Sequence, residues 1–501
     1  MFLQLINRQK LSSIALLIVY LILAIIIVPI IVPIKEEFQF NFDEGIETMR
    51  ALLYMKGFLP HQEIWSDHPF LFTQFLSVWL TIFGKSILWA RLLTISFSAL
   101  LIWFLFETIR LDLGIFPAFI GSLSLAASSG FIRFSSAVMI GIPALSFTII
   151  SIYFLFIYKH HKKNYLLALS GVFFALALQI KFLTVFLIPM NLMLIIISHK
   201  KPVEEDLKIT RKIINSVSIW LVSFTIIFLS LSFFFHALSY EQLLGTHFGS
   251  EVKTAFSTKN GFKFLSQVII NKDFDLFYLA ILGVCVVFIK RKWEGLFPVA
   301  WLGTATLLLI NHQPVWPHHY CLIAIPMAWL AAYGSVPCVN LFKHRQYLLK
   351  PKKMKIHNYM LGIISLGLMI FLLINLKPKV ARDIPSLQQD YSSQFAVVNR
   401  LADKRNSTKW LFTDVPIYGF YADLVVPPEI AVFSTKRIKT KQLTQEQVYE
   451  LLLKYQPEQI LIGRFKGFFY TSSHINSYIN QFYVKSDDIS VADHYVIKSL
   501  K

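Results

Sequence analysis

Long apolar runs separated by short basic or polar segments dominate the hydropathy pattern of the chain. A membrane-spanning helix needs about 20 predominantly apolar residues, and about eleven runs approach or exceed that length. The runs cover residues 11–34, 87–109, 114–131, 138–158, 164–180, 182–198, 214–236, 274–289, 295–310, 320–340 and 358–376. The pattern predicts a polytopic α-helical membrane protein with about eleven transmembrane helices, of which the first is too long for a cleaved signal segment.

Two runs need more than their length to be placed. Residues 164–198 would measure about 52 Å as a single helix, whereas the hydrocarbon core is only about 30 Å thick. Both flanks are basic, "KHHKK" before and "HKK" after, and basic flanks belong on the cytoplasmic side. A helical hairpin with Lys181 at its outer tip is therefore predicted. Residues 69–84 are short for a span and are predicted to lie along the outer interface.

Basic residues set the predicted orientation. They gather at the turns that the scheme places in the cytoplasm, for example at 159–163 and 290–292, and are sparser in the outer loops. The N-terminus is therefore predicted to be cytoplasmic, in a chain that lies in the plasma (inner) membrane. The chain is 55% hydrophobic and 15% charged, with a net charge of +19. Because the cytoplasmic turns account for this charge, no nucleic-acid partner is expected.

The composition changes after the last apolar run. Residues 1–376 form the predicted transmembrane catalytic domain, which includes an interfacial first outer loop at 35–86. Within residues 377–501, "TQEQVYELLLKY" (444–455) is typical of an amphipathic helix and "EQILIG" (458–463) of a buried strand. With a cytoplasmic N-terminus, an odd number of spans places this region on the extracytoplasmic side of the membrane. It is predicted to be a soluble extracytoplasmic α/β domain.

Ionisable side chains are nearly absent from the middles of the runs and collect at their outer ends. The group consists of Asp43, Glu44, Asp67, His68, Arg133, Lys181, His247, Glu251, His312, His318 and His319. Proton and ion pathways usually leave ionisable groups at mid-membrane. The pattern therefore favours a reaction at the outer interface, at the depth where the phosphate of a polyprenyl-phosphate sugar lies.

The carboxylates also have simpler interpretations. Asp43 can cap a helix that starts at Gly45, with Glu44 as a solvated neighbour. Asp67 can cap the helix predicted at 69–84.

The cations likewise have a second interpretation. Lys181 and Arg133 can meet the phosphates of ordinary membrane lipids. The aromatic residues of "HQPVWPHHY" (312–320) fit an interfacial belt. A belt does not explain the adjacent His318 and His319, which favours a role for them in a site.

Sugar transfer from a lipid phosphate needs a base for the acceptor hydroxyl and positive charge beside the departing phosphate. Asp43 and the neighbouring Glu44 are the candidate catalytic carboxylates. The candidate phosphate-binding residues are Lys181, Arg133, His68, His318 and His319. A divalent metal held by Asp67 and His247 would be a further source of positive charge.

The order of these features resembles the GT-C superfamily of membrane glycosyltransferases. It is similar in particular to protein O-mannosyltransferases and to the bacterial transferases that add aminoarabinose or other sugars to lipid A. The motifs that carry the resemblance are "DEG" (43–45), "GFLPHQEIWSDHPFLF" (57–72), "GKSILWARLL" (84–93), "LQIKFLTVFLIP" (178–189), "HHYCLIAIP" (318–326) and "WLFTDVPIYGFYADLVVPPEIA" (410–431). Their order extends over nearly the whole chain.

The resemblance implies an inverting transfer from an undecaprenyl- or dolichyl-phosphate sugar to a lipid, glycan or protein acceptor, with Asp43 as the catalytic carboxylate. Asp67 stands where relatives have an acidic residue that can hold a divalent metal, and Lys181 matches a hairpin lysine near the donor phosphate. Two positions depart from the pattern. "GIP" (141–143) replaces Asp-x-Pro, and His68 replaces a lysine, which makes positive charge there depend on pH.

Two other functions compete with transfer. A transporter or flippase of a lipid-linked substrate would use the same interfacial charges for binding without chemistry. The charge-free span centres, the lack of an internal repeat and the appended outer domain favour a transferase over a transporter. A catalytically inactive scaffold is the third alternative, because the site departs from the family pattern at two positions.

Overall fold

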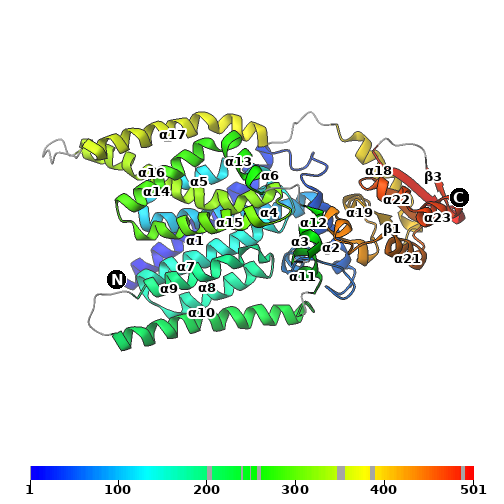
Figure 1. Ribbon diagram of the computed structural model, residues 1–501, viewed down its shortest axis with the longest axis horizontal. Helices are drawn as coiled ribbons and strands as arrows, with labels where there is room; N and C mark the ends of the chain where they lie inside the picture. Colours follow the sequence, from blue (N-terminus) through cyan, green and yellow to red (C-terminus); the bar gives the residue numbers. More distant parts are fainter. Residues whose placement is uncertain are drawn as a thin grey trace.

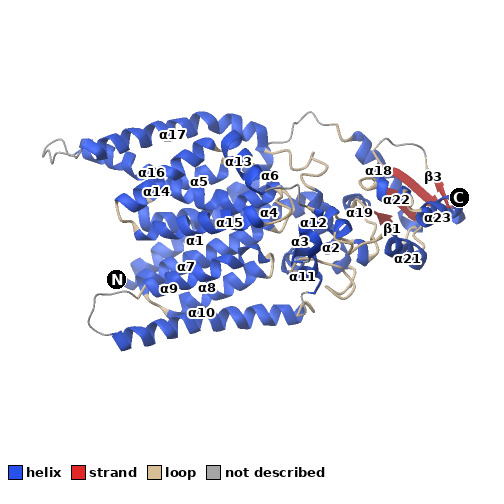
Figure 2. Cartoon of the chain, in the orientation of Figure 1, coloured by secondary structure: helices blue, strands red, loops and turns tan. Residues whose placement is uncertain are grey.

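The computed structural model describes residues 2–199, 206–238, 241–248, 250–256, 261–346, 356–383, 390–486 and 491–500. The molecule is elongated, with a bundle of long helices at one end and a smaller region of helices and strands at the other (Figure 1). This second region, residues 390–486 and 491–500, is called the mixed region below. Within the described residues, strands occur only after residue 410, in the mixed region (Figure 2).

Each predicted apolar run forms a helix of the bundle. The helices are α1 (Phe2–Ile31), α4 (Ile87–Leu113), α5 (Ile115–Ala126), α7 (Gly141–His161), α8 (Asn164–Leu178), α9 (Ile188–Ile197), α10 (Asp206–Phe234), α14 (Phe274–Ile289), α15 (Leu296–Asn311), α16 (Cys321–Gln346) and α17 (Ile356–Asp383). Over the described residues, 6 helices are long and apolar enough to cross a membrane, and shorter apolar helices occupy the other runs. The polytopic helical class agrees with this arrangement, and the span count of about eleven stays a prediction.

The run 164–198 is broken into two helices. Helix α8 ends at Leu178, the chain turns, and the 3₁₀ helix η1 (Phe182–Leu187) leads into α9. The hydroxyl of Tyr158, before α8, lies 2.8 Å from Nε2 of His199, after α9. Both ends of the run therefore lie on the same side of the bundle, and the predicted hairpin is confirmed.

Short helices cover the end of the bundle that faces the mixed region. They are α2 (Phe42–Met55), α3 (Leu71–Phe83), α6 (Phe131–Ser136), α11 (Glu241–Phe248), α12 (Ser250–Ala255), α13 (Gly261–Lys272) and η3 (Pro317–Tyr320). These helices bring residues from distant parts of the sequence to one end of the bundle. A further short helix, η2 (Trp293–Gly295), lies in the turn before α15, where Glu294 pairs with Lys159 of α7.

Neither candidate aspartate caps a helix. Helix α2 begins at Phe42 rather than at Gly45, and its cap is Asn41, whose Oδ1 accepts a hydrogen bond from the backbone N of Asp43 at 3.1 Å. Helix α3 is preceded by Phe70, and no side chain caps it. The capping interpretations of Asp43 and Asp67 are therefore wrong, which leaves both carboxylates available for another role.

The mixed region combines a small sheet with short helices. Its elements are α18 (Ser392–Asp403), η4 (Arg405–Ser407), β1 (Leu411–Thr413), α19 (Pro416–Ala422), η5 (Pro428–Ile430), α20 (Thr435–Lys439), α21 (Gln445–Tyr455), β2 (Gln459–Ile462), α22 (Lys466–Tyr470), α23 (Ser473–Phe482), β3 (Tyr483–Lys485), β4 (Asp493–Ile497) and η6 (Lys498–Leu500). The strand order is β1-β2-β4-β3, in which β1 and β2 are parallel and the other pairs antiparallel.

Two elements of this region match the sequence analysis directly. Helix α21 starts at a capping box formed by Thr444 and Gln447, and β2 is buried along its whole length. The predicted boundary between residues 376 and 377 falls inside α17, which continues to Asp383. The change of structure therefore comes later than predicted.

The first outer loop packs between the bundle and the mixed region. The ring of Phe38 lies against Tyr418 and Tyr421 of α19, with centroid separations of 5.0 and 5.1 Å. Farther along the loop, the guanidinium carbon of Arg437 lies 4.0 Å from the Trp65 ring centroid. The loop therefore forms the interface between the two parts of the molecule.

Candidate active site

A cavity of about 510 Å³ lies where the bundle, the first outer loop and the mixed region meet. Its charged and imidazole lining consists of Asp43, Glu47, Arg50, Asp67, His68, Arg133, Lys181, His247, His312, His318, His319, Lys436 and Arg464. Every candidate site residue from the sequence except Glu44 is among them. The tertiary structure therefore gathers side chains that are up to several hundred residues apart in the sequence.

Of the three carboxylates of α2, Asp43 is the one without an arginine partner, since Glu44 pairs with Arg91 and Glu47 with Arg50. It lies in the first turn and lines the cavity. Within the described residues, its side chain accepts no hydrogen bond and forms no ion pair. Burial raises the pKa of Asp43, whereas the positive charge of Lys181 lowers it and the charge of Asp67 raises it further. A free carboxylate with a raised pKa is suited to accept a proton near neutral pH.

Glu44 is adjacent to Asp43 in the sequence, but both of its carboxylate oxygens accept hydrogen bonds from other residues. Its Oε1 and Oε2 accept hydrogen bonds from Nε and Nη2 of Arg91 at 3.0 and 2.9 Å. Backbone N–H groups of Phe40 and Val138 donate to the same carboxylate at 2.7 and 3.0 Å. Both Glu44 and Arg91 are 0% exposed. The expectation of a solvated Glu44 is wrong, and its placement outside the cavity argues against a catalytic role.

Lys181 reaches the cavity from the turn of the helical hairpin. Its side chain is nearly buried, at 9% exposure. It makes no hydrogen bond or ion pair with any residue in the described part of the chain. Burial lowers the pKa of Lys181, and the charges of Asp43 and Asp67 raise it. An unpaired buried ammonium group is costly unless a ligand completes it, so this position favours an anion.

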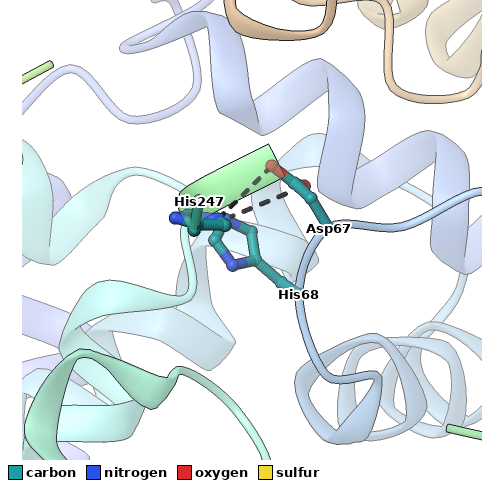
Figure 3. A group of neighbouring side chains, drawn as sticks. All are labelled: Asp67, His68 and His247. Carbon is teal, nitrogen blue, oxygen red and sulfur yellow. Dashed lines mark ion pairs between the residues drawn. The ribbon is translucent and has the colours of Figure 1, made fainter. Parts of the chain in front are cut away.

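Asp67, His68 and His247 all line the cavity and form a compact group (Figure 3). Oδ2 of Asp67 lies 3.6 Å from Nε2 of His247, and Oδ1 lies 3.9 Å from Nε2 of His68. Each residue offers one ligand atom, and these atoms lie within 4.8 Å of one another. One carboxylate and two imidazoles are a donor set that suits a divalent transition metal such as Zn²⁺.

Lys436 extends to this group from the mixed region. Its Nζ donates a hydrogen bond to Nδ1 of His247 at 2.8 Å, which places the ring proton of a neutral imidazole on Nε2. Burial lowers the pKa of His247, and that of Lys436 falls to about 8 for the same reason. A positive charge therefore stands beside Asp67 at neutral pH when no metal is bound.

Arg133, His318 and His319 also belong to the lining of the cavity. The Nε and Nη2 groups of Arg133 donate to the backbone oxygen of Phe40 at 2.9 and 2.5 Å. These two hydrogen bonds connect α6, which carries Arg133, to the segment just before Asp43. The rings of His318 and His319 lie 4.5 Å apart, and Nδ1 of His319 accepts a hydrogen bond from the backbone N of Trp316 at 3.3 Å.

The sequence analysis missed four charged residues of the lining. Glu47 and Arg50 follow Asp43 by four and seven positions, so helical periodicity alone would have placed them on its face. Nη1 of Arg50 donates to both carboxylate oxygens of Glu47, at 3.0 and 3.1 Å. Lys436 and Arg464 carry no comparable signal, because only the docking of the mixed region brings them to the cavity.

Comparison with known proteins places this geometry in a structural context. Residues 67–236 match the family described as dolichyl-phosphate-mannose-protein mannosyltransferase. The matched stretch includes Asp67, His68, Arg133 and Lys181 and begins after Asp43. ArnT from Cupriavidus metallidurans, in a structure bound to undecaprenyl phosphate, aligns with a TM-score of 0.60 over 98% of this chain and 99% of that chain, at 12% sequence identity. The chain has the GT-C glycosyltransferase fold.

Other GT-C structures agree with this assignment. The archaeal oligosaccharyltransferase AglB from Archaeoglobus fulgidus, in complex with an inhibitory peptide and a dolichol-phosphate, aligns with a TM-score of 0.55 at 9% identity, over 97% of this chain and 74% of that chain. A second structure of an oligosaccharyltransferase from Archaeoglobus fulgidus, in complex with Zn and sulfate, aligns with a TM-score of 0.54 at 9% identity, over 95% and 73% of the two chains. No curated protein sequence matches the chain. At the level of the fold, the resemblance to the GT-C superfamily inferred from the sequence is confirmed.

Proposed function

We propose that this protein is an inverting glycosyltransferase that moves a sugar from a polyprenyl-phosphate donor to a lipid, glycan or protein acceptor of the cell envelope. One observation carries the proposal. The free carboxylate of Asp43 and the unpaired, nearly buried ammonium group of Lys181 line the same cavity. A base and a phosphate-binding cation are the two groups that this transfer requires.

The transfer follows from these two groups. Asp43 accepts the proton of the acceptor hydroxyl, and the acceptor oxygen forms a bond to the anomeric carbon of the sugar. The bond between that carbon and the phosphate oxygen breaks, and the polyprenyl phosphate leaves with the electron pair. Lys181 and Arg133 offset the negative charge that develops on the phosphate, because both line the cavity. His68, His318 and His319 offer further hydrogen-bond partners for its oxygens.

The donor-binding role of Lys181 is open to direct measurement. Lys181→Ala is expected to raise the KM for a labelled polyprenyl-phosphate sugar by about 10–100-fold, the usual loss for one charge-assisted hydrogen bond. Folding should be little affected, because the substitution removes an unpaired charge. Lys272→Ala, which alters an exposed lysine at the end of α13, is the control and should behave as wild type.

The outcome of this assay also separates the competing functions. An unchanged KM in Lys181→Ala would remove the residue from the donor site. Donor lipid that binds to the wild-type protein without transfer to any envelope acceptor would favour a transporter or flippase. Wild-type protein that neither binds nor transfers the donor would favour an inactive scaffold.

We further propose that the cavity and the mixed region face away from the cytoplasm in the plasma (inner) membrane. The basic turns at 159–163 and 290–292 support this orientation. In a Cys285→Ser background, which removes the exposed native thiol, cysteines introduced at the exposed positions Gln62 and Gln481 should react with a membrane-impermeant thiol reagent in intact cells. A cysteine at the exposed Lys163 is the matched control and should stay protected. The reverse labelling pattern would invert the topology.

A further inference from the structure

The residues on both sides of Asp43 are held by contacts from outside α2. The guanidinium carbon of Arg464 lies 3.6 Å from the centroid of the Phe42 ring. The carboxylate of Glu44 is fixed by Arg91, as described above. Gly45 packs against the backbone of α19, where an added Cβ would lie only 2.7 Å from the N atom of Ile417. The carboxylate of Asp43 is free, whereas the backbone that carries it is clamped.

Two of these contacts come from one edge of the small sheet. Strands β1 and β2 are parallel, with Thr413 beside Leu461, so their carboxyl ends lie at the same edge. Helix α19 follows β1, and the turn that carries Arg464 follows β2. The mixed region therefore presents both contacts to α2 together.

A buried carboxylate makes this edge rigid. Asp414, directly after β1, is 0% exposed. It accepts hydrogen bonds from the backbone N atoms of Gly463, Arg464 and Phe465 at 2.8, 2.9 and 2.5 Å. These bonds connect the ends of β1 and β2 and fix the turn that places Arg464 on Phe42. The guanidinium of Arg464 also lies over the Phe465 ring, with its carbon 4.8 Å from the ring centroid, and its Nη2 donates a 3.4 Å hydrogen bond to Oγ1 of Thr435.

We propose that the mixed region positions the catalytic carboxylate, with Arg464 and Ile417 as positioning residues that act on Asp43 through Phe42 and Gly45. This inference rests on the proposed transferase function. It explains why a glycine follows the two acidic residues in "DEG" (43–45): at Gly45, α2 approaches the backbone of α19 too closely for any side chain. It also gives the mixed region a direct part in the chemistry.

Arg464 has an electrostatic effect as well as a steric one. The charged groups that shift the pKa of Asp43 are Lys181 from the hairpin turn, Asp67 from the first outer loop and Arg464 from the mixed region. Glu47, one turn along α2, is also coupled to it, because the charge of Asp43 raises the pKa of Glu47. The charge of Arg464 lowers the pKa of Asp43. Loss of this charge should therefore raise that pKa and move the acid limb of the kcat/KM profile to higher pH.

Gly45→Ala tests the positioning role without removing any functional group from the cavity. We expect kcat for sugar transfer to fall by about 10–100-fold, because a displacement of about 1 Å at a reacting group has an effect of that size. The KM for the lipid donor should change little, since Lys181 and Arg133 are untouched. Gly303→Ala in α15 is the matched control, because an added Cβ there meets no atom within 4 Å.

Arg464→Ala and Arg464→Lys provide a second test that does not depend on the tolerance of α2 for alanine. Arg464→Ala should lower kcat and move the acid limb upward in pH, whereas Arg464→Lys should restore the position of the acid limb because it keeps the charge. Wild-type kcat in both Gly45→Ala and Arg464→Ala would overturn the positioning role. A wild-type protein without transfer would instead contradict the proposed function, so the two failures are distinguishable.

Discussion

Asp43→Asn is expected to lower the rate of sugar transfer by roughly 10²–10⁴, the usual contribution of a positioned general base. The substitution keeps the size of the side chain and removes its ability to accept the proton. Folding should be preserved, because Asn41 rather than Asp43 caps α2. Binding of the donor lipid should also persist, since Lys181 and Arg133 remain. Transfer assays on membranes with a labelled polyprenyl-phosphate sugar, paired with donor-binding measurements, check both expectations.

Glu36→Gln is the matched control for this variant. Glu36 belongs to the same outer loop but is exposed and does not line the cavity. Its conversion to an amide should leave transfer unchanged. Near-wild-type transfer in Asp43→Asn would exclude Asp43 as the base and move that role to Asp67 or Glu47, the other carboxylates of the lining.

Because burial raises the pKa of Asp43, the acid limb of the wild-type kcat/KM profile should lie above the ordinary range of an aspartate. The carboxylate acts as a base only when it is deprotonated, so transfer should be lost as the pH falls through this raised value. This limb should disappear from the residual activity of Asp43→Asn. If the acid limb persists unchanged in Asp43→Asn, the group that titrates there is not Asp43.

Glu44→Gln is expected to have a large effect of a different kind. It leaves Arg91 buried without a counter-charge, and breaking a buried ion pair by changing one partner typically costs about 3–5 kcal/mol of folding free energy. The guanidinium of Arg91 also donates from Nη1 to the backbone oxygens of Ile34 and Glu37, at 2.6 and 2.7 Å. The loss should therefore loosen the start of the first outer loop. A lower Tm in detergent and a reduced amount of protein in the membrane would report it.

Glu107→Gln is the matched control on the same helix as Arg91. Glu107 pairs with Arg110, whose side chain is 41% exposed, and exposed pairs contribute only about 0–1 kcal/mol. Its Tm should therefore stay close to that of wild type. A Glu44→Gln protein with normal Tm and lost transfer would instead return Glu44 to the catalytic group.

Much of the helical bundle follows from local sequence, because an apolar run in a bilayer has few alternatives to a helix. The break at Lys181 was predictable from run length and from basic residues on both flanks. The gathering of Asp67, His68, Arg133 and Lys181 at one end was predictable for the same reason: each lies at the outer end of an apolar run. Helix α21 and strand β2 were likewise readable from periodicity and capping.

The choice between the adjacent carboxylates of "DEG" was not readable from the sequence. Successive residues of a helix point about 100° apart, so one of Asp43 and Glu44 faces the cavity and the other faces the bundle. Glu44 is the one that faces the bundle because it pairs with Arg91, which lies 47 positions later in the chain. Local rules favoured a capping Asp43 and a solvated Glu44, but the buried ion pair and the cap supplied by Asn41 override both.

The sequence by itself determined the bundle, the hairpin and the outer-end position of most candidate residues, because these depend on hydropathy and on charge near each run. Only the tertiary structure decided which carboxylate is free and brought Lys436 and Arg464 into the cavity. Those two residues reach it through the parallel pairing of β1 with β2 and through the close contact of α19 with Gly45. Both are non-local packing events that leave no periodic signal in the chain, since Leu411 pairs with Gln459, 48 positions later, and Gly45 and Ile417 are 372 positions apart.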